Sequence, residues 1–380
     1  MASERAFVHK NVSCIEDDKY PCTEITSCVF DPTCQRLACA FGDHRVLILS
    51  ENSNSNNSIQ EWDRNILTVY PQSLSSFLSS QAIIIQVDWN ADGSLLAAGD
   101  FNGLFFVFSA TNGNLLSFTN VSSKLTNIHW NRKGSHNLLL VSCENGTVEV
   151  WHLSEQTPLL VQNFVHHTSS VRDIKWLTKE TFASCALDGS IFVCRIGNEE
   201  TLYSLFTEHP IMSIRYSVKQ DALAFFSYDK NVKFWLLDQD YIREWEGHSK
   251  GIYAICLKES DDSNLLASGG ADQTVRIWNI DSSLCQSQQI LRGHEFLIVA
   301  LSFSQNGSYL ASADSNGIVI VWSTEKWLSL FVHQCYGTIL DTNSLQWNSK
   351  STKLVVANQS NKIGIIECKS SDEMPLLKRE

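Results

Sequence analysis

The sequence predicts an all-β protein that folds as an eight-bladed β-propeller and is closed by an N-terminal strand. Two repeating patterns with a common period run through the 380 residues. In the first, a polar residue is followed by an apolar residue three positions later and by an apolar or aromatic residue six positions later. In the second, a short alternating segment ends in a large apolar residue. Two series that share one period are typical of a repeat architecture.

The first pattern occurs eight times and gives the blade count. It begins at Asp43, Asn102, Asn145, Asp188, Asp229, Asp272, Asn316 and Ser360. Its last residues are Leu49, Phe108, Trp151, Cys194, Trp235, Trp278, Trp322 and Ile366. Successive last residues are 59, 43, 43, 41, 43, 44 and 44 positions apart. All gaps except the first lie in or close to the period of about 40–45 residues that four-stranded propeller blades show.

The second series supplies the first strand of each blade. Segments such as "SVRDIKW" and "IVALSF" alternate in hydrophobicity and lead, through a Gly- or Asn-containing turn, into small-residue segments such as "LLAAG". Alternation bounded by such turns predicts short antiparallel strands. The series consists of Phe30, Trp89, Trp130, Trp176, Tyr216, Leu257, Phe303 and Trp347. Eight of the eleven tryptophans belong to one series or the other, which indicates that they wedge between neighbouring blades.

The long first gap and the two ends of the chain set the predicted domain boundaries. Residues 50–80 are rich in Ser and Asn and should form a surface loop within or beside the first blade's outer strand, either as a partner loop or as a tolerated insertion. The last unit ends at Ile366 with its third strand. Residues 4–9 are expected to supply the fourth, which removes two open sheet edges. The propeller thus spans residues 1–368, and residues 369–380 form a flexible tail.

The composition narrows the classes of ligand that the protein is expected to bind. A net charge of −12 argues against direct binding of nucleic acid, whereas an acidic surface suits basic partners such as histone tails. No stretch is long and apolar enough to span a membrane. Neither a phosphate-binding glycine motif nor a zinc-type Cys/His spacing occurs, so no cofactor and no metal are expected. Twelve cysteines without a C-x-x-C pair are expected to be reduced and mostly buried.

Histidine, serine and aspartate recur together and allow two interpretations. As chemistry, His248, Ser268 and Asp272 would form a hydrolase triad. As structure, they form a buried relay that also accepts the indole N–H of Trp278 and braces the blade. The corresponding residues are His294, Ser312, Asn316 and Trp322 in the seventh unit, and His167, Ser184, Asp188 and Cys194 in the fourth. An enzyme needs one triad, and no G-x-S-x-G elbow surrounds these serines, so the repetition predicts a brace and no enzyme.

Four segments resemble a known family. They are "VDWNADGSLLAAGDFNG" (87–103), "IKWLTKETFASCALDGSIFVCRIG" (174–197), "LLASGGADQTVRIWNID" (265–281) and "FSQNGSYLASADSNGIVIVW" (303–322). They are similar to the WD-repeat propeller of the transducin β-like family, the F-box-like/WD-repeat subunits of nuclear corepressor complexes. Cys194, in place of the usual Trp, is the most distinctive likeness. Members of that family carry a LisH-type oligomerisation module and an F-box-like segment before the propeller, whereas this sequence starts at the propeller.

Partner contacts are expected on the face where the inner strands begin and the hairpin turns converge on the central channel. Exposed aromatic and arginine side chains commonly dominate the energetics of interfaces. The candidates are Phe101, Glu144, Arg172, Leu187, Tyr228 and Tyr253. Glu144 would accept hydrogen bonds from a basic peptide. The alternative for each of the others is that the side chain packs across two blades.

The resemblance implies a non-catalytic interaction scaffold of a transcriptional corepressor, located in the nucleus and also in the cytoplasm. Its implied partners are proteins: subunits of a corepressor or histone deacetylase complex, or histone tails. Two alternatives stay open within the same class, namely a generic WD-repeat scaffold and a substrate adaptor of a ubiquitin ligase. A propeller hydrolase is the alternative from a different class.

Overall fold

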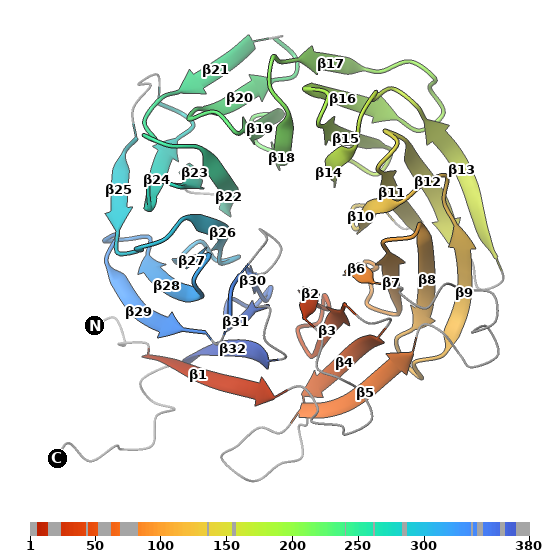
Figure 1. The fold of residues 1–380 in the computed structure, drawn as a ribbon, viewed down its shortest axis with the longest axis horizontal. Helices are drawn as coiled ribbons and strands as arrows, with labels where there is room; N and C mark the ends of the chain where they lie inside the picture. Colours follow the sequence, from red (N-terminus) through yellow and green to blue (C-terminus); the bar gives the residue numbers. More distant parts are fainter. Residues whose placement is uncertain are drawn as a thin grey trace.

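Eight four-stranded antiparallel sheets are arranged as blades around a central channel in the computed structural model (Figure 1). The structure describes residues 6–13, 24–42, 45–51, 62–68, 83–134, 137–153, 157–239, 241–260, 263–282, 287–335, 337–339, 345–357 and 362–369. The first and eighth repeat starts, Asp43 and Ser360, lie outside these residues. The predicted eight-bladed all-β propeller is confirmed.

The blades follow one another in chain order, and each blade runs outward from the channel. Blades one to four comprise β2 (Ile25–Phe30), β3 (Arg36–Phe41), β4 (Arg45–Glu51) and β5 (Trp62–Thr68); β6 (Ile84–Trp89), β7 (Leu95–Asp100), β8 (Leu104–Ser109) and β9 (Leu115–Asn120); β10 (Leu125–Trp130), β11 (Leu138–Cys143), β12 (Val148–Leu153) and β13 (Pro158–Phe164); β14 (Val171–Trp176), β15 (Thr181–Ala186), β16 (Ser190–Arg195) and β17 (Tyr203–Phe206). Blades five to eight comprise β18 (Ile211–Ser217), β19 (Ala222–Ser227), β20 (Val232–Leu236) and β21 (Tyr241–Trp245); β22 (Ile252–Ser260), β23 (Ser263–Gly270), β24 (Thr274–Asn279) and β25 (Gln289–Arg292); β26 (Ile298–Phe303), β27 (Tyr309–Asp314), β28 (Ile318–Ser323) and β29 (Ser329–Gln334); β30 (Leu345–Trp347), β31 (Lys353–Val356), β32 (Lys362–Lys369) and β1 (Ala6–Ser13).

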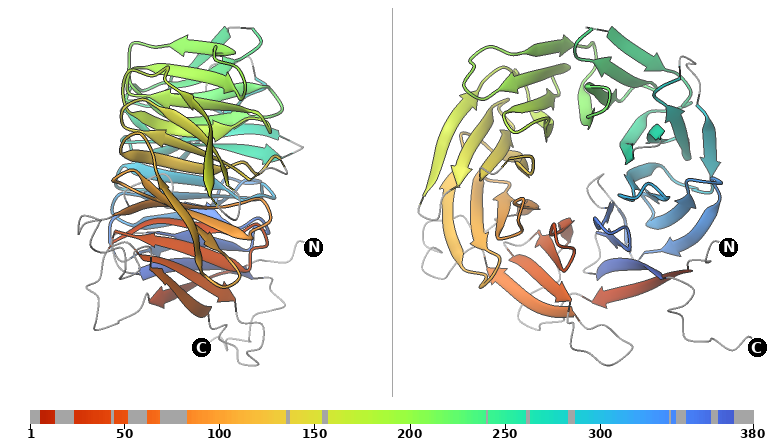
Figure 2. Two further views of the ribbon diagram at one scale, coloured as in Figure 1. Left: turned by 90° about the vertical axis from the view of Figure 1, so that its right-hand side faces the viewer. Right: turned by 180° about the vertical axis from the view of Figure 1, so that it is seen from behind.

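The ring has two faces, and Figure 2 shows it edge-on and from behind. We call the face on which the inner strands begin the upper face, and the face on which they end the lower face. In blades two to seven, the hairpin turn between the second and third strands also lies on the upper face. The channel therefore opens at an upper and a lower mouth, and side chains early and late in each inner strand lie near different mouths.

The hydrophobic core is divided among the blade interfaces. Eight clusters of buried side chains each join two neighbouring blades, including the eighth and the first. Second strands are packed on both faces, and β11 is buried at every position. Small residues are needed where a neighbouring inner strand approaches: a Cβ on Gly269 would lie 2.5 Å from Cγ2 of Ile298. This explains the small-residue segments of the sequence.

Three tryptophans at the ends of inner strands link their blade to the one before it. The indole Nε1 of Trp89 donates to the carbonyl of Val29 at 3.1 Å. Trp176 bonds in the same way to His129 and Trp347 to Ser302, at 3.0 and 3.1 Å. The structure thus shows these tryptophans between blades, as the repeat predicts.

The N-terminal strand completes the eighth blade. Strand β1 pairs antiparallel with β32 along eight residues, from Ala6 opposite Lys369 to Ser13 opposite Lys362. Ring closure by the N-terminus is confirmed, and the strand continues beyond the predicted residue 9 to Ser13, because β32 offers backbone partners along its whole length; residues 4 and 5 of the predicted strand lie outside the described residues. Strand β32 also continues to Lys369, the first residue of the predicted tail.

The outer strand of the first blade, β5, lies inside the stretch predicted as an insertion. The flanking residues 52–61 and 69–80 lie outside the described residues, as do residues 370–380 of the predicted tail. Among the residues that the structure describes, no helix is long and apolar enough to cross a membrane.

Deleting residues 1–13 should lower the melting temperature by about 5 °C or more, because β32 loses a partner along its whole length and the ring opens. Thermal unfolding followed by circular dichroism measures this. Deletion of residues 1–5, which precede β1, is the control and should leave the melting temperature unchanged. Equal melting temperatures for the 1–13 deletion and the intact chain would show that closure contributes nothing.

Candidate functional site

The histidine, serine and aspartate of the sixth blade form one buried hydrogen-bonded unit. Nε2 of His248 lies 2.7 Å from Oγ of Ser268, and Nδ1 lies 3.0 Å from both carboxylate oxygens of Asp272. The indole of Trp278 donates to the same serine oxygen at 2.8 Å. A carboxylate beside Nδ1 fixes the proton there, so Nε2 accepts from the serine hydroxyl. Ser268 is 0% exposed, which leaves no space for a substrate at its oxygen.

The seventh blade repeats this unit, but the carboxylate that meets the histidine comes from a different position. Nε2 of His294 lies 2.7 Å from Oγ of Ser312, and Trp322 donates to that oxygen at 2.8 Å. The acceptor at Nδ1 is Asp314, at 2.9 Å, and not the predicted Asn316. Asn316 instead donates its backbone N–H to Asp314.

The reason for the exchange is visible in the sixth blade. Gly270 occupies the strand position that Asp314 holds in the seventh, because each pairs with the first residue of its inner strand. A Cβ on Gly270 would lie 3.0 Å from Nδ1 of His248. Where the second strand of the blade ends in glycine, the aspartate of the following turn occupies the space beside Nδ1 of the histidine. Where it ends in aspartate, the turn residue is not needed.

The fourth blade contains a longer relay. Nε2 of His167 lies 2.8 Å from Oγ of Ser184, but Nδ1 meets Oγ of Ser190 at 2.6 Å, and Ser190 in turn donates to Asp188. Asp188 itself stays 3.6 Å from the histidine. Sequence reasoning missed Ser190, although the Asp-Gly-Ser turn places a hydroxyl two residues after the carboxylate. Cys194 supplies no indole N–H.

The fifth blade lacks the unit. Phe225 stands at the serine position of β19, and His209 is exposed. The indole N–H of Trp235 accordingly has no hydrogen-bond partner within the described part of the chain. The unit therefore recurs in three blades with exchanged partners and is absent where the serine is replaced, as expected of a brace between hairpins and not of a reaction centre.

The six candidate contact residues fall into two groups and two single positions on the upper face. Phe101 is 43% exposed, and Nζ of Lys124 lies 4.8 Å from the centre of its ring. The same lysine pairs with Glu144 at 3.3 Å. Arg172 is exposed on β14, whereas Leu187 is half-buried. Lys124 was missed by sequence reasoning, and Phe101 and Glu144 are thus already engaged with each other through it.

The second group is a pair of tyrosines shared by the fifth and sixth blades. Tyr228 is 55% exposed and Tyr253 is 38% exposed. Their ring centres are 6.1 Å apart with the planes inclined at 59°. Gly251 allows this approach, since a Cβ there would lie 3.1 Å from the carbonyl of Tyr228. No lysine or arginine of the described chain covers either ring.

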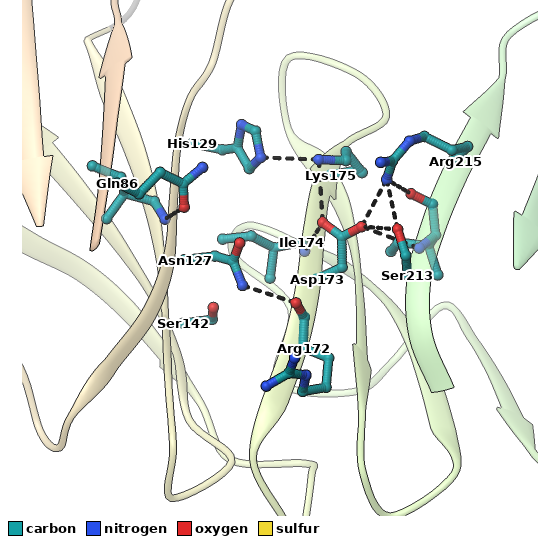
Figure 3. Close-up of polar contacts among 12 residues, drawn as sticks. Gln86, Asn127, His129, Ser142, Arg172, Asp173, Ile174, Lys175, Ser213 and Arg215 are labelled. Atoms are coloured by element: carbon teal, nitrogen blue, oxygen red, sulfur yellow. Dashed lines mark hydrogen bonds and ion pairs between the residues drawn. The ribbon is translucent and has the colours of Figure 1, made fainter. Parts of the chain in front are cut away.

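A charged network lines the lower part of the channel, and sequence reasoning did not find it. Asp88, His129, Lys175 and Arg215 come from four successive inner strands, and each directly precedes an aromatic residue at or next to the end of its strand. Figure 3 shows His129, Lys175 and Arg215 side by side, with Asp173 between the last two. The repeated charged residue before Trp or Tyr was the available signal.

Hydrogen bonds join this network across the blades. Nζ of Lys175 lies 2.9 Å from Nε2 of His129 and 3.1 Å from Oδ1 of Asp173, and Nη1 of Arg215 lies 2.8 Å from Oδ2 of Asp173. Asp88 accepts from Arg132 and lies 3.6 Å from Nδ1 of His129. Since Nε2 of His129 accepts from a lysine, its proton sits on Nδ1 and faces Asp88.

Burial and neighbouring charges determine the protonation states in the network. Burial alone would raise the pKa of Asp88, but Arg132 and His129 outweigh it and hold that pKa at about 2. Burial, followed by Lys175, lowers the pKa of His129. The network thus holds two carboxylates and a neutral imidazole among cations.

Other reactive groups do not assemble. No group of three His, Cys, Asp or Glu side chains among the described residues is arranged to hold a metal ion. The cysteines in the described part are free thiols, and burial raises the pKa of Cys194, Cys256 and Cys335 to about 12. Such thiols are poor nucleophiles near neutral pH.

The comparisons with known proteins agree with the architecture. The model of the family "WD domain, G-beta repeat" matches residues 159–194, 239–279 and 285–323. The human F-box-like/WD repeat-containing protein TBL1Y is 28% identical over 306 residues, which cover 76% of this chain and 55% of that protein. The WD40 repeat-containing protein HOS15 of Arabidopsis thaliana is 25% identical, over 76% of this chain and 48% of its own length. The chain thus spans about half the length of these relatives.

A solved structure shows the same fold. The C-terminal WD40 domain of Sif2 superposes with a TM-score of 0.74 and 21% sequence identity, covering 94% of this chain and 98% of that domain.

The variant His248→Ala should lower the free energy of unfolding by about 1–3 kcal/mol, because it leaves Asp272 and the buried hydroxyl of Ser268 without their partner. Chemical denaturation monitored by tryptophan fluorescence measures the change. His209→Ala, in the blade without the unit, is the matched control and should be neutral. A neutral His248→Ala would refute the bracing role.

Stability should also fall with acid through His167. Burial lowers its pKa to about 4, against the usual 6.5, although Asp188 pulls in the opposite direction. Between these values the unfolded chain takes up a proton that the folded protein does not, so the free energy of unfolding drops by up to about 1.4 kcal/mol per pH unit as pH decreases. Denaturation curves measured between pH 7 and 4 give the free energy of unfolding at each pH. This free energy should depend less steeply on pH in the His167→Gln variant than in the intact protein. Identical pH slopes for the two proteins would contradict this assignment.

Proposed function

The chain is a WD-repeat propeller protein similar to the F-box-like/WD repeat-containing proteins, and from this premise we propose that it is a non-catalytic scaffold that binds a basic segment of a partner protein on its upper face. The observation that carries the proposal is the exposed pair Tyr228 and Tyr253 beside the channel mouth. WD-repeat proteins typically act by binding and not by catalysis. The partners that the resemblance to the transducin β-like family implies are subunits of a corepressor or histone deacetylase complex in the nucleus, or histone tails.

The upper face itself supports the choice of a basic partner. Aromatic ring faces attract lysine and arginine side chains. At Phe101 this attraction is satisfied internally, because Lys124 covers the ring and Glu144 holds the lysine. At Tyr228 and Tyr253 the described chain places no such cation, so the rings are available to one from a partner. The net charge of −12 favours the approach of a basic segment.

Arg172 and Leu187 have different parts in this proposal. Arg172 is exposed between the two aromatic groups in chain order, and its carbonyl accepts from Asn127 at 2.9 Å, which fixes its backbone (Figure 3). Its guanidinium can pair with an acidic residue of the partner and set the orientation of a bound segment. Leu187 is half-buried and contributes to packing at the rim.

Tyr228→Ala combined with Tyr253→Ala should weaken binding of a synthetic histone-tail peptide about tenfold or more, since two exposed aromatic contacts are lost. Fluorescence anisotropy of a labelled peptide measures the change. Tyr203→Ala is the matched control: Tyr203 is 39% exposed, close to the 38% of Tyr253, but lies on an outer strand. Equal affinity of the double variant and the intact protein would exclude the tyrosine pair as the binding site.

Affinity purification from nuclear extract distinguishes the corepressor assignment from its alternative. Recovery of histone deacetylase subunits with the intact protein, and their loss with the double variant, supports the proposed partner class. Recovery of cullin components instead would identify a ubiquitin-ligase adaptor and overturn the corepressor assignment.

A further inference from the structure

The lower part of the channel contains a cavity of about 520 Å³. The wall of this cavity has a charged side and a neutral side. Blades two to five contribute the charged residues of the network, and blades six to eight and one contribute neutral side chains. The neutral wall includes Cys256, Leu257, Leu301, Phe303, Leu345 and Gln346. The volume lies in the range of pockets that bind small molecules.

Positive charge exceeds negative charge around this cavity. The cations on its wall are Arg132, Lys133, Lys175 and Arg215. Two carboxylates oppose them: Asp88, on the wall, and Asp173, which lies behind Lys175 and Arg215. With His129 neutral, the cluster has a surplus of two positive charges inside a protein whose net charge is −12. Such a surplus is not explained by the general charge of the molecule.

The acceptors of the cluster are already used, whereas several donors are not. Oδ1 of Asp173 accepts from the backbone of Ile174 and from Lys175, and Oδ2 accepts from Ser213, Ile214 and Arg215. No acceptor in the described part of the chain meets Nε or Nη2 of Arg215, or Nη1 of Arg132. Only 21% of the Arg215 side chain is exposed, so these donors are only partly compensated by water.

The neutral wall also has unused hydrogen-bonding capacity. Gln346 of β30 holds the strand position that Asp88 holds in β6, one residue before the final tryptophan, and its buried Oε1 has no hydrogen-bond partner among the residues that the structure describes. A glutamine amide presents both an acceptor and two donors, and rotation exchanges them. The cavity therefore has polar groups on opposite walls.

We propose that this cavity binds a small, multiply phosphorylated anion through Arg132, Lys133, Lys175 and Arg215. Guanidinium groups pair with phosphate oxygens through two parallel hydrogen bonds, and lysines add point charges. A phosphate between the two halves of the cluster would accept from the unused N–H groups of Arg132 and Arg215. The Gln346 amide would contact the ligand from the neutral wall. The site lies at the lower mouth and is independent of the upper-face proposal.

Isothermal titration calorimetry with sodium tripolyphosphate, at constant ionic strength, tests the site. The intact protein should bind one equivalent, and Arg132→Gln combined with Lys133→Gln should weaken binding about tenfold or more, since two cationic contacts are lost. Both residues are exposed at the mouth, so the fold should persist, which circular dichroism checks. Lys124→Gln removes one cation from the upper face and should bind like the intact protein.

Three results would overturn the proposal. They are equal affinity in the Arg132/Lys133 variant and the intact protein, equal heat from sulfate at the same ionic strength, and binding of a phosphopeptide without binding of tripolyphosphate. Should the double variant fail to fold, Lys133→Gln alone and Arg215→Lys provide the comparison: each should weaken binding of tripolyphosphate while Lys124→Gln does not. Because the site proposed for the histone tail lies at the other mouth, binding of the tail should be unchanged in the lower-mouth variants, so the two proposals fail separately.

Discussion

The structure depends on a packing constraint that no blade can meet alone. Each blade buries its second strand between two neighbours, and the eight hydrophobic clusters all lie at the junctions of blades. A missing neighbour would expose one complete sheet face. The ring must therefore close, and pairing of β1 with β32 closes it by joining the two ends of the chain in one sheet. The close approach of Ile298 to Gly269 shows how little space the junctions leave.

This packing explains why polar groups recur inside the ring. Apolar junctions hold the blades together but do not fix the hairpin turns on the upper face. A buried histidine that joins a serine, a carboxylate and an indole connects the loop before the inner strand to the second and third strands of the same blade. Every polar atom in such a unit has a partner, so burying it costs little. The unit is dispensable, since the fifth blade forms with Phe225 in place of the serine.

The sequence predicts the features that follow from repetition and fails where contacts depend on register between distant strands. Period and strand alternation suffice for the eight blades and for the closing strand. The predicted partner of His294 was wrong. Spacing alone selects Asn316, whereas Nδ1 of His294 meets the carboxylate of Asp314 at the end of β27. The channel network was missed for a similar reason. In the sequence, a single charged residue before an aromatic residue looks like a solvated surface charge. Only the packing of four successive blades brings Asp88 and Arg215 into one cluster.

The channel shows where the repeats stop being equivalent. Positions that pack between blades are filled by similar residues throughout, because every junction has the same geometry. Positions that face the channel are under no such constraint, since their side chains line a cavity and are not enclosed in an apolar junction. Four successive blades place Asp, His, Lys and Arg at one of these positions, and the sixth blade places Cys256 there. Differences at positions free of packing demands cost little stability, so a symmetric ring can acquire an asymmetric channel, and its chemistry is encoded in the residues by which the blades differ.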